Sequence, residues 1–167
     1  MRAFGISLAL TLLAAAAMAQ QQAQPTDQTM KTFSSSADVQ ALIAKARSER
    51  KEGQPVVAEH ILQLAPYNVN LEYRASVGPA AVHEREAEMF YVIDGTATMV
   101  TGGKLVKETR TNAENLSGTA IEGGSSRSIA KGDFIIVPEN TPHWFSAING
   151  TLVVMSLHVP RAVTSTR

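Results

Sequence analysis

Two histidines and one glutamate are the residues of this chain whose types and spacing could hold a metal ion. His83 lies five positions before Glu88, and His143 follows a Pro-Glu-Asn-Thr-Pro segment. Five positions would put His83 and Glu88 on opposite faces of one strand, but a turn through residues 84–87 lets two adjacent antiparallel strands present both side chains inward. Two neutral imidazoles and one carboxylate leave coordination positions open, an arrangement typical of non-haem Fe(II). We therefore expect His83, Glu88 and His143 to bind a divalent metal, with Fe(II) or Mn favoured and Zn, Ni or Cu as alternatives.

The amino-acid composition limits the metal ligands that the chain can offer and the classes of partner that it can bind. The chain has 167 residues, 44% of them hydrophobic, and no cysteine. This length fits one domain with a single core. Without cysteine, disulfides, thiolate nucleophiles and Cys-ligated metals are excluded, so metal ligands must come from His, Asp or Glu. Basic and acidic residues number 15 each, and this balance argues against nucleic acid or an anionic membrane surface as a partner.

The first nineteen residues have the pattern of an export signal. Arg2 gives a positive start, residues 3–17 are mostly apolar, and Ala17-Met18-Ala19 resembles a cleavage site before Gln20. A retained membrane anchor is the alternative, but the apolar run is shorter than the ~20 residues that span a bilayer. We expect a signal peptide at 1–19 and a mature protein that is periplasmic or secreted by a bacterium, with no membrane partner after cleavage.

The segment after the signal divides into a leader and a helix. Residues 20–33 are rich in Gln, Thr and Pro, which predicts a flexible leader. Within residues 34–53, apolar residues recur at helical spacing, and Ser35 with Asp38 has the spacing of a capping box. We expect one amphipathic helix there, packed on the rest of the fold.

From residue 54 to residue 160 the pattern changes to short apolar or alternating runs separated by turn residues. This pattern is typical of an all-β sandwich or barrel. Residues 107–126 are polar and contain glycine, which predicts a long hairpin loop. The expected strands are 56–64, 69–77, 80–83, 88–93, 96–101, 104–107, 127–130, 134–137, 143–147 and 152–159.

Two segments resemble the signature motifs of the cupin superfamily. The first motif contains His-x-His, then three or four residues, Glu, six residues and Gly. Counting back from Gly95, six residues separate it from Glu88, and four more separate Glu88 from His83, which takes the place of the second histidine. Ala81 stands where the motif has its first histidine.

The second motif runs Gly, five residues, Pro-x-Gly, two residues and His. Gly132, Pro138 and His143 fit this spacing, with Asn140 in place of the second glycine. Asparagine tolerates positive φ, so the turn can survive the replacement. The resemblance covers about residues 56–160 and implies a double-stranded β-helix, the cupin jelly-roll barrel.

The resemblance implies a barrel over 54–160, a tail at 161–167 and a metal site inside the barrel, and it leaves several functions open. One is a metal-dependent enzyme of the dioxygenase, isomerase or lyase type on a small organic molecule, where the ion acts at the position that Ala81 leaves free. Another is a non-catalytic small-ligand-binding or sensor cupin that has lost its metal. A structural storage cupin is a third alternative.

Three further side chains could belong to the site. His60 and His158 lie in expected strands, where a hydrogen-bonded structural histidine is favoured over a catalytic base. Trp144 follows His143 directly and is therefore a candidate pocket residue.

Two other features concern the surface. Arg85 lies between two glutamates in the expected turn, which predicts a solvated hairpin tip. Residues 89–93 are apolar on both faces of their strand, and one small barrel cannot cover both faces without the helix or a partner. We therefore expect a homodimer that binds a small-molecule substrate or ligand.

Overall fold

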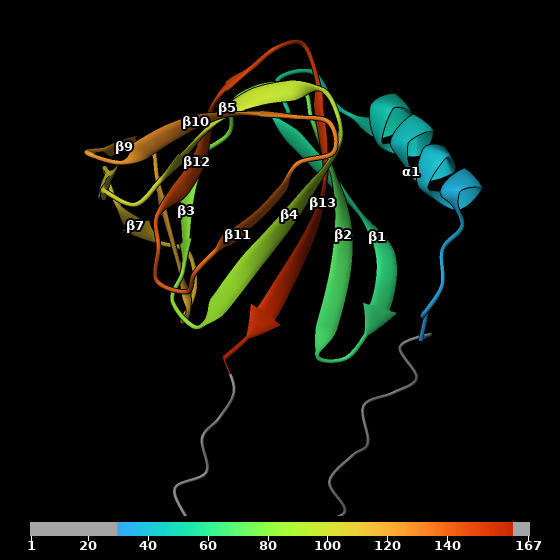
Figure 1. The fold of residues 1–167 in the computed structure, drawn as a ribbon, viewed down its shortest axis with the longest axis horizontal. Coiled ribbons are helices and arrows are strands. Elements are labelled where there is room, and N and C mark those ends of the chain that lie inside the picture. The colour runs from blue at the N-terminus through green and yellow to red at the C-terminus, as the bar shows by residue number, and fades with distance from the viewer. Residues whose placement is uncertain (1–29, 162–167) are drawn as a thin grey trace, which may run out of the picture.

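Two antiparallel β-sheets pack face to face, with one helix on the outside (Figure 1). The computed structural model describes residues 30–161, so the predicted signal peptide, most of the leader and most of the tail lie outside the described residues. The described elements are α1 (Ser36–Glu49), β1 (Val56–Leu64), β2 (Tyr67–Arg74), β3 (Ala80–His83), β4 (Glu86–Asp94), β5 (Thr96–Thr101), β6 (Lys104–Val106), β7 (Thr109–Arg110), β8 (Asn115–Gly118), β9 (Ala120–Glu122), β10 (Ser125–Ala130), β11 (Phe134–Val137), β12 (His143–Ile148) and β13 (Leu152–Pro160).

The strands are interleaved between the two sheets. The five-stranded sheet has the order β1-β2-β13-β4-β11, and the six-stranded sheet has the order β10-β5-β12-β3-β8-β7. A small two-stranded sheet, β6-β9, lies beside them. Strands that are distant in the chain, such as β2 and β13, are neighbours in space, which is the arrangement of a jelly roll. The predicted all-β jelly roll with one N-terminal helix is confirmed.

The apolar core lies between the two sheets and is built from alternate residues of the strands. Phe90, Phe145 and Val154 are buried on the inner faces of β4, β12 and β13. Because side chains alternate along a strand with a period of two, the residues two positions away point inward as well. On these three strands the next inward residues are Glu88, His143 and Ser156, all of them buried.

Helix α1 covers the outer face of β1 and β2. The Ser35 hydroxyl accepts a hydrogen bond from the Asp38 N–H, and the Asp38 carboxylate accepts one from the Ser35 N–H, so the predicted capping box is present. The helix ends at Glu49, earlier than the predicted 34–53, because the backbone of Arg50 is extended. The buried residues of this contact are Ala46, Ile61, Leu71, Tyr73 and Val153. Within residues 30–161, no helix combines the length and apolarity needed to cross a membrane.

The predicted loop at 107–126 is wrong, because this segment forms β7, β8 and β9. Strand β8 pairs with β3 and brings Ser117 opposite Ala81 and Asn115 opposite His83. The segment is polar, so it carries no hydrophobic alternation to reveal a strand. Its backbone pairing with β3 holds it in the sheet instead. This added strand supplies Asn115, whose side-chain oxygen is a hydrogen-bond partner of His83.

Candidate metal centre

The structure brings the three predicted residues together around the carboxylate of Glu88. Glu88 lies on the inner face of β4 and is 4% exposed. Its Oε2 atom is 3.1 Å from Nε2 of His83 and 3.0 Å from Nε2 of His143. Both imidazoles come from the six-stranded sheet, whereas Glu88 comes from the five-stranded sheet. The cluster therefore lies between the sheets, at the end of the apolar core.

His83 and Glu88 face each other across the barrel. β3 ends at His83 in one sheet and β4 begins at Glu86 in the other, so the turn between them crosses from sheet to sheet. The expected pairing of two adjacent strands in one sheet is therefore wrong, although both side chains point inward as predicted. Consecutive strands of a jelly roll often belong to opposite sheets, which is why a short turn can set two ligands face to face.

The turn before β12 has the positive φ that the second motif requires. Asn140 has a φ of 54°, and its N–H donates a 2.7 Å hydrogen bond to the carbonyl of His83. Asparagine thus replaces glycine without loss of the turn, as predicted. The hydrogen bond also ties the turn that leads to His143 directly to β3.

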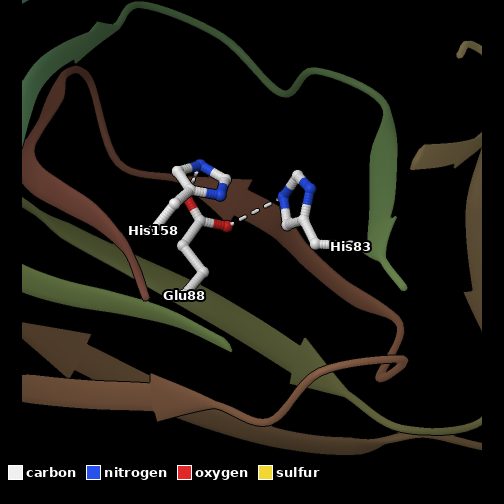
Figure 2. Close-up of side chains that lie close together, drawn as sticks. All are labelled: His83, Glu88 and His158. Atoms are coloured by element: carbon white, nitrogen blue, oxygen red, sulfur yellow. Dashed lines mark ion pairs between the residues drawn. The ribbon is translucent and has the colours of Figure 1, made fainter. Parts of the chain in front are cut away.

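A third imidazole, from His158 on β13, completes the cluster. His158 is the cross-strand partner of Glu88, and its Nε2 lies 3.4 Å from Glu88 Oε1. The rings of His83 and His158 meet edge to face, with centroids 4.5 Å apart. Figure 2 shows the Glu88 carboxylate between these two rings. One ligand atom each from His83, Glu88 and His158 lie within 4.8 Å of one another.

The sequence pattern favours a structural role for His158, and the structure places it in the site instead. The signal that could have found it is the alternation of Leu152, Val154, Ser156 and His158 along one face of β13. The pairing of β13 with β4, which sets His158 beside Glu88, depends on the order of strands in the sheet. That order is not visible in the local sequence.

Each of the three imidazoles has its other nitrogen bonded to an oxygen outside the cluster. Nδ1 of His83 lies 2.7 Å from Asn115 Oδ1, Nδ1 of His143 lies 3.1 Å from the Thr141 carbonyl, and Nδ1 of His158 lies 3.1 Å from Glu86 Oε2. These oxygens can only accept, so Nδ1 donates in every case. A neutral imidazole has one N–H, so in the neutral form of each ring the Nε2 lone pair faces Glu88. A doubly protonated ring donates to Glu88 through Nε2 instead.

Ser156 holds the carboxylate from the side of β13. Its hydroxyl donates a 2.6 Å hydrogen bond to Glu88 Oε1, and its side chain is completely buried. The two carboxylate oxygens thus have different partners. Oε2 faces His83 and His143, while Oε1 faces Ser156 and His158.

The cluster strongly favours a charged carboxylate. Burial alone would raise the pKa of Glu88, but hydrogen bonds from His143, His158 and His83 outweigh it and hold that pKa far below its ordinary range. Burial lowers the pKa of His83, and its contacts with Glu88 and Asn115 more than reverse this. The hydrogen bond to Glu88 raises the pKa of His158. Without a metal ion, protons therefore hold the cluster together.

The donor set fits a divalent cation. A carboxylate oxygen and an imidazole lone pair repel each other at about 3 Å unless a proton or a cation lies between them. Around an ion with ligand distances of ~2.1 Å, neighbouring ligand atoms are ~3.0–3.4 Å apart. The separations of Glu88 from His83, His143 and His158 are 3.1, 3.0 and 3.4 Å. The outward hydrogen bonds at Nδ1 are those that orient metal-binding histidines in proteins.

Three other residues lie apart from this cluster. The Trp144 indole N–H donates a 2.8 Å hydrogen bond to the Gly78 carbonyl, and its side chain lies on the face of β12 opposite to His143, so the structure does not bring it to the carboxylate. His60 is bonded through Nδ1 to Asn70 Oδ1, 2.8 Å away, on the exposed part of β1. Ala81 pairs with His143 but offers no donor atom.

The charged turn between β3 and β4 is only partly a solvated tip. Arg85 is exposed and lies 3.4 Å from Glu114. Glu84 forms a paired contact with Arg110 on β7, at 2.7 and 3.0 Å. Glu86 accepts from His158 and so supports the cluster. The predicted solvated tip therefore holds for Arg85 and not for its two neighbours.

A groove of ≈ 590 Å³ opens beside β3 and β8. It is lined on one side by the connection between β2 and β3, including Val77 and Pro79, and on the other by Thr109 and Ser117. Ser117 pairs with Ala81, two residues before His83 on β3. Side chains two residues apart share a strand face, so Ala81 faces the same way as His83, but no residue of the carboxylate cluster lines this groove.

Two sheets that enclose a carboxylate and three imidazoles define an all-β jelly-roll protein with an internal site of metal-binding type. The chain belongs to the cupin family, whose family model matches residues 58–162, more than half of the sequence. The predicted membership of the cupin superfamily is therefore confirmed. A comparison with curated proteins finds no match.

Three of the solved structures that resemble this chain are those of KdgF, a cupin superfamily protein and Fe(II) HppE. KdgF from Halomonas sp. is 17% identical to this chain, with a TM-score of 0.48. The match covers 68% of this chain and 87% of KdgF. A cupin superfamily protein from Desulfitobacterium hafniense DCB-2 is 13% identical, with a TM-score of 0.46. The match covers 68% of this chain and 84% of that protein. Fe(II) HppE is 15% identical, with a TM-score of 0.49. The match covers 65% of this chain and 53% of HppE.

Proposed function

We propose that this chain is a metal-dependent cupin enzyme acting on a small organic molecule, with a divalent ion bound by His83, Glu88 and His143. One observation carries the proposal. The imidazoles around Glu88 direct their Nε2 atoms at a buried carboxylate, while their Nδ1 atoms donate to fixed oxygens elsewhere. Imidazole and carboxylate ligands with open positions suit Fe(II) or Mn, while Zn, Ni and Cu accept similar donors.

The chain leaves one side of this centre open to a ligand. A bound divalent ion would polarise a substrate oxygen or a water molecule. Glu88 supplies negative charge, and Asn115 and Thr141 hold the imidazoles in place. Ala81 presents only a methyl group, and its cross-strand partner Ser117 lines a nearby groove. A groove of ≈ 590 Å³ is within the usual range for small-molecule sites, which supports a small organic substrate.

Metal analysis of the purified protein tests this function. We expect about one divalent ion per wild-type chain, and His83→Ala and His143→Ala should each retain much less metal than the wild type because each loses an imidazole ligand. His60→Ala is the matched control, since this histidine lies away from Glu88. If wild type and both site variants carry the same trace of metal, the enzyme proposal fails and a ligand-binding barrel replaces it.

We also propose that the protein is exported to the bacterial periplasm or secreted. The support is the sequence of the first nineteen residues and the absence of cysteine from the whole chain. Mass spectrometry of material from the expressing cells should find Gln20 or a close neighbour as the first residue. Intact chains beginning at Met1 in the membrane fraction would contradict export.

Finally, we propose a homodimer that forms through the outer face of β11 and β4. Phe134 and Ile136 of the edge strand β11 are 72% and 66% exposed. Phe134 lies against Tyr91 of β4, with ring centroids 4.5 Å apart. Helix α1 covers the other end of this sheet, over β1 and β2 (Figure 1). A second copy of the chain would cover the apolar face that the helix leaves open.

A further inference from the structure

His158 differs from the other two imidazoles in its origin. His83 and His143 belong to the six-stranded sheet and approach Oε2 of Glu88. His158 belongs to β13 in the five-stranded sheet and approaches Oε1, at 3.4 Å. It lies outside both sequence motifs, fifteen positions beyond His143. Nothing in the sequence assigns it to the metal.

We propose that His158 is a protein ligand of the ion, a third imidazole supplied by the last strand of the barrel. This inference rests on the proposed metal site. His83, Glu88 and His158 each offer one ligand atom, and these atoms lie within 4.8 Å of one another. Two ligands on opposite sides of an ion are ~4.2 Å apart at bond lengths of ~2.1 Å. These three atoms are therefore near enough to one another for small side-chain shifts to place them around one ion.

When the ring of His158 is neutral, its hydrogen bonds suit a metal ligand and not a donor to Glu88. Ser156 already donates to Oε1 of Glu88, at 2.6 Å. Nδ1 of His158 donates to Glu86, so its Nε2 brings a lone pair toward the carboxylate. A neutral ring in this orientation has nothing to donate to Glu88. A cation between the two groups satisfies both of them.

Metal-binding histidines usually donate a hydrogen bond from the ring nitrogen that does not bind the metal, often to a carboxylate. His158 has such a partner. Glu86 lies two residues before Glu88 on the same strand, and its Oε2 accepts from Nδ1 of His158 at 3.1 Å. This contact fixes the tautomer and makes the Nε2 lone pair a stronger donor to a metal. Ala81 offers no such donor on β3. The third imidazole thus enters from the sheet opposite to Ala81.

Counting imidazoles around the bound metal tests the inference. X-ray absorption spectroscopy on the Zn-loaded protein should find three imidazoles in the wild type and two in His158→Ala. In a competition with a chelator, the metal affinity of His158→Ala should fall roughly 100-fold, since a ligand matters at least as much as the outer partners that cost 10–100-fold. Free imidazole should restore part of that affinity by filling the space left by the ring.

His60→Ala provides the matched control, because His60 is a hydrogen-bonded histidine on the same sheet that does not contact Glu88. It should keep three imidazoles and the wild-type affinity. An unchanged imidazole count overturns the inference, whether it is found in His158→Ala or, if that variant does not fold, in His158→Asn. A wild type without stoichiometric metal overturns the proposed function as well, so the two failures are distinct.

Discussion

The Ser156 hydroxyl and Glu88 Oε1 form a 2.6 Å hydrogen bond that is closed off from solvent. Ser156 faces Phe90 across the β13–β4 pair, one inward position away from Glu88. The bond therefore fixes the carboxylate from inside the core, on the side away from His83 and His143. A buried carboxylate without this donor would be free to turn its oxygens.

Ser156→Ala should weaken metal binding without preventing folding. Loss of a hydrogen bond to a metal-binding carboxylate typically costs 10–100-fold in affinity, and we expect a loss of about that size. Titration of the metal-free variant with Zn in the presence of a chelator measures it. Ser146→Ala is the control, because Ser146 bonds to the Thr98 carbonyl on β5. Equal affinities for the two variants would contradict a role of Ser156 at the centre.

Ala81→His should add a donor to the open side of the centre. The new imidazole would lie on the same strand face as His83 and beside His143. We expect metal binding to tighten and the binding of small exogenous ligands to weaken, since the added ring fills a position that such ligands use. The Co-loaded protein reports both effects through the change in its visible spectrum when azide is added. Unchanged azide binding with tighter metal binding would place the open position elsewhere.

The stability of the metal-free protein should depend on pH in a defined direction. The raised pKa values of His83 and His158 contribute stability below pH 6.5, and this contribution is lost as the pH rises through their folded-state values. The lowered pKa of Glu88 contributes stability above pH 4.5, lost only as the pH falls far below that value. The cluster therefore stabilises the metal-free fold most between about pH 4.5 and 6.5.

Urea unfolding in the presence of a chelator at pH 6 and pH 8.5 measures this effect, with the higher free energy of unfolding expected at pH 6. Bound metal should reverse the trend, because protons compete with the ion for the imidazoles. The carboxylate of Glu86 also faces His158, so His158→Asn should flatten the pH dependence. A metal-free protein that is more stable at pH 8.5 would contradict the charges assigned to the cluster.

The apolar outer face of β11 should control association. Phe134→Glu places a charge among apolar side chains of this face and should shift a dimer to a monomer in light scattering at micromolar concentration. Tyr67→Glu is the control, because Tyr67 is 49% exposed at the β1–β2 turn, next to a different edge of the sheet. A wild type that is monomeric under the same conditions would count against the dimer.

The sequence predicts the strands of the core well, since apolar alternation and turn residues mark them. β1, β3, β5 and β11 begin and end where the pattern places them. The convergence of His83, Glu88 and His143 was also predictable from the resemblance to the two cupin motifs, although the turn between His83 and Glu88 crosses between the sheets instead of joining neighbours in one sheet. The positive φ of Asn140 follows from the same motif.

Contacts between distant strands are what the sequence could not predict. Asn115 lies in a polar segment without alternation, yet it accepts the Nδ1 proton of His83. His158 reaches Glu88 only because β13 is inserted between β2 and β4. Both contacts depend on strand order, which is decided by the packing of the whole barrel and leaves no local pattern.

The carboxylate cluster spans the gap between the two sheets. Glu88 and His158 stand on one sheet, and His83 and His143 on the other. An ion bound by residues of both sheets would act as a cross-link between them. It would lie at the polar end of the sandwich, beyond the apolar core. Loading the metal would then clamp the sheets together, and releasing it would require them to part. A variant that binds the ion more tightly would therefore also resist separation of the two sheets at this end of the barrel more strongly.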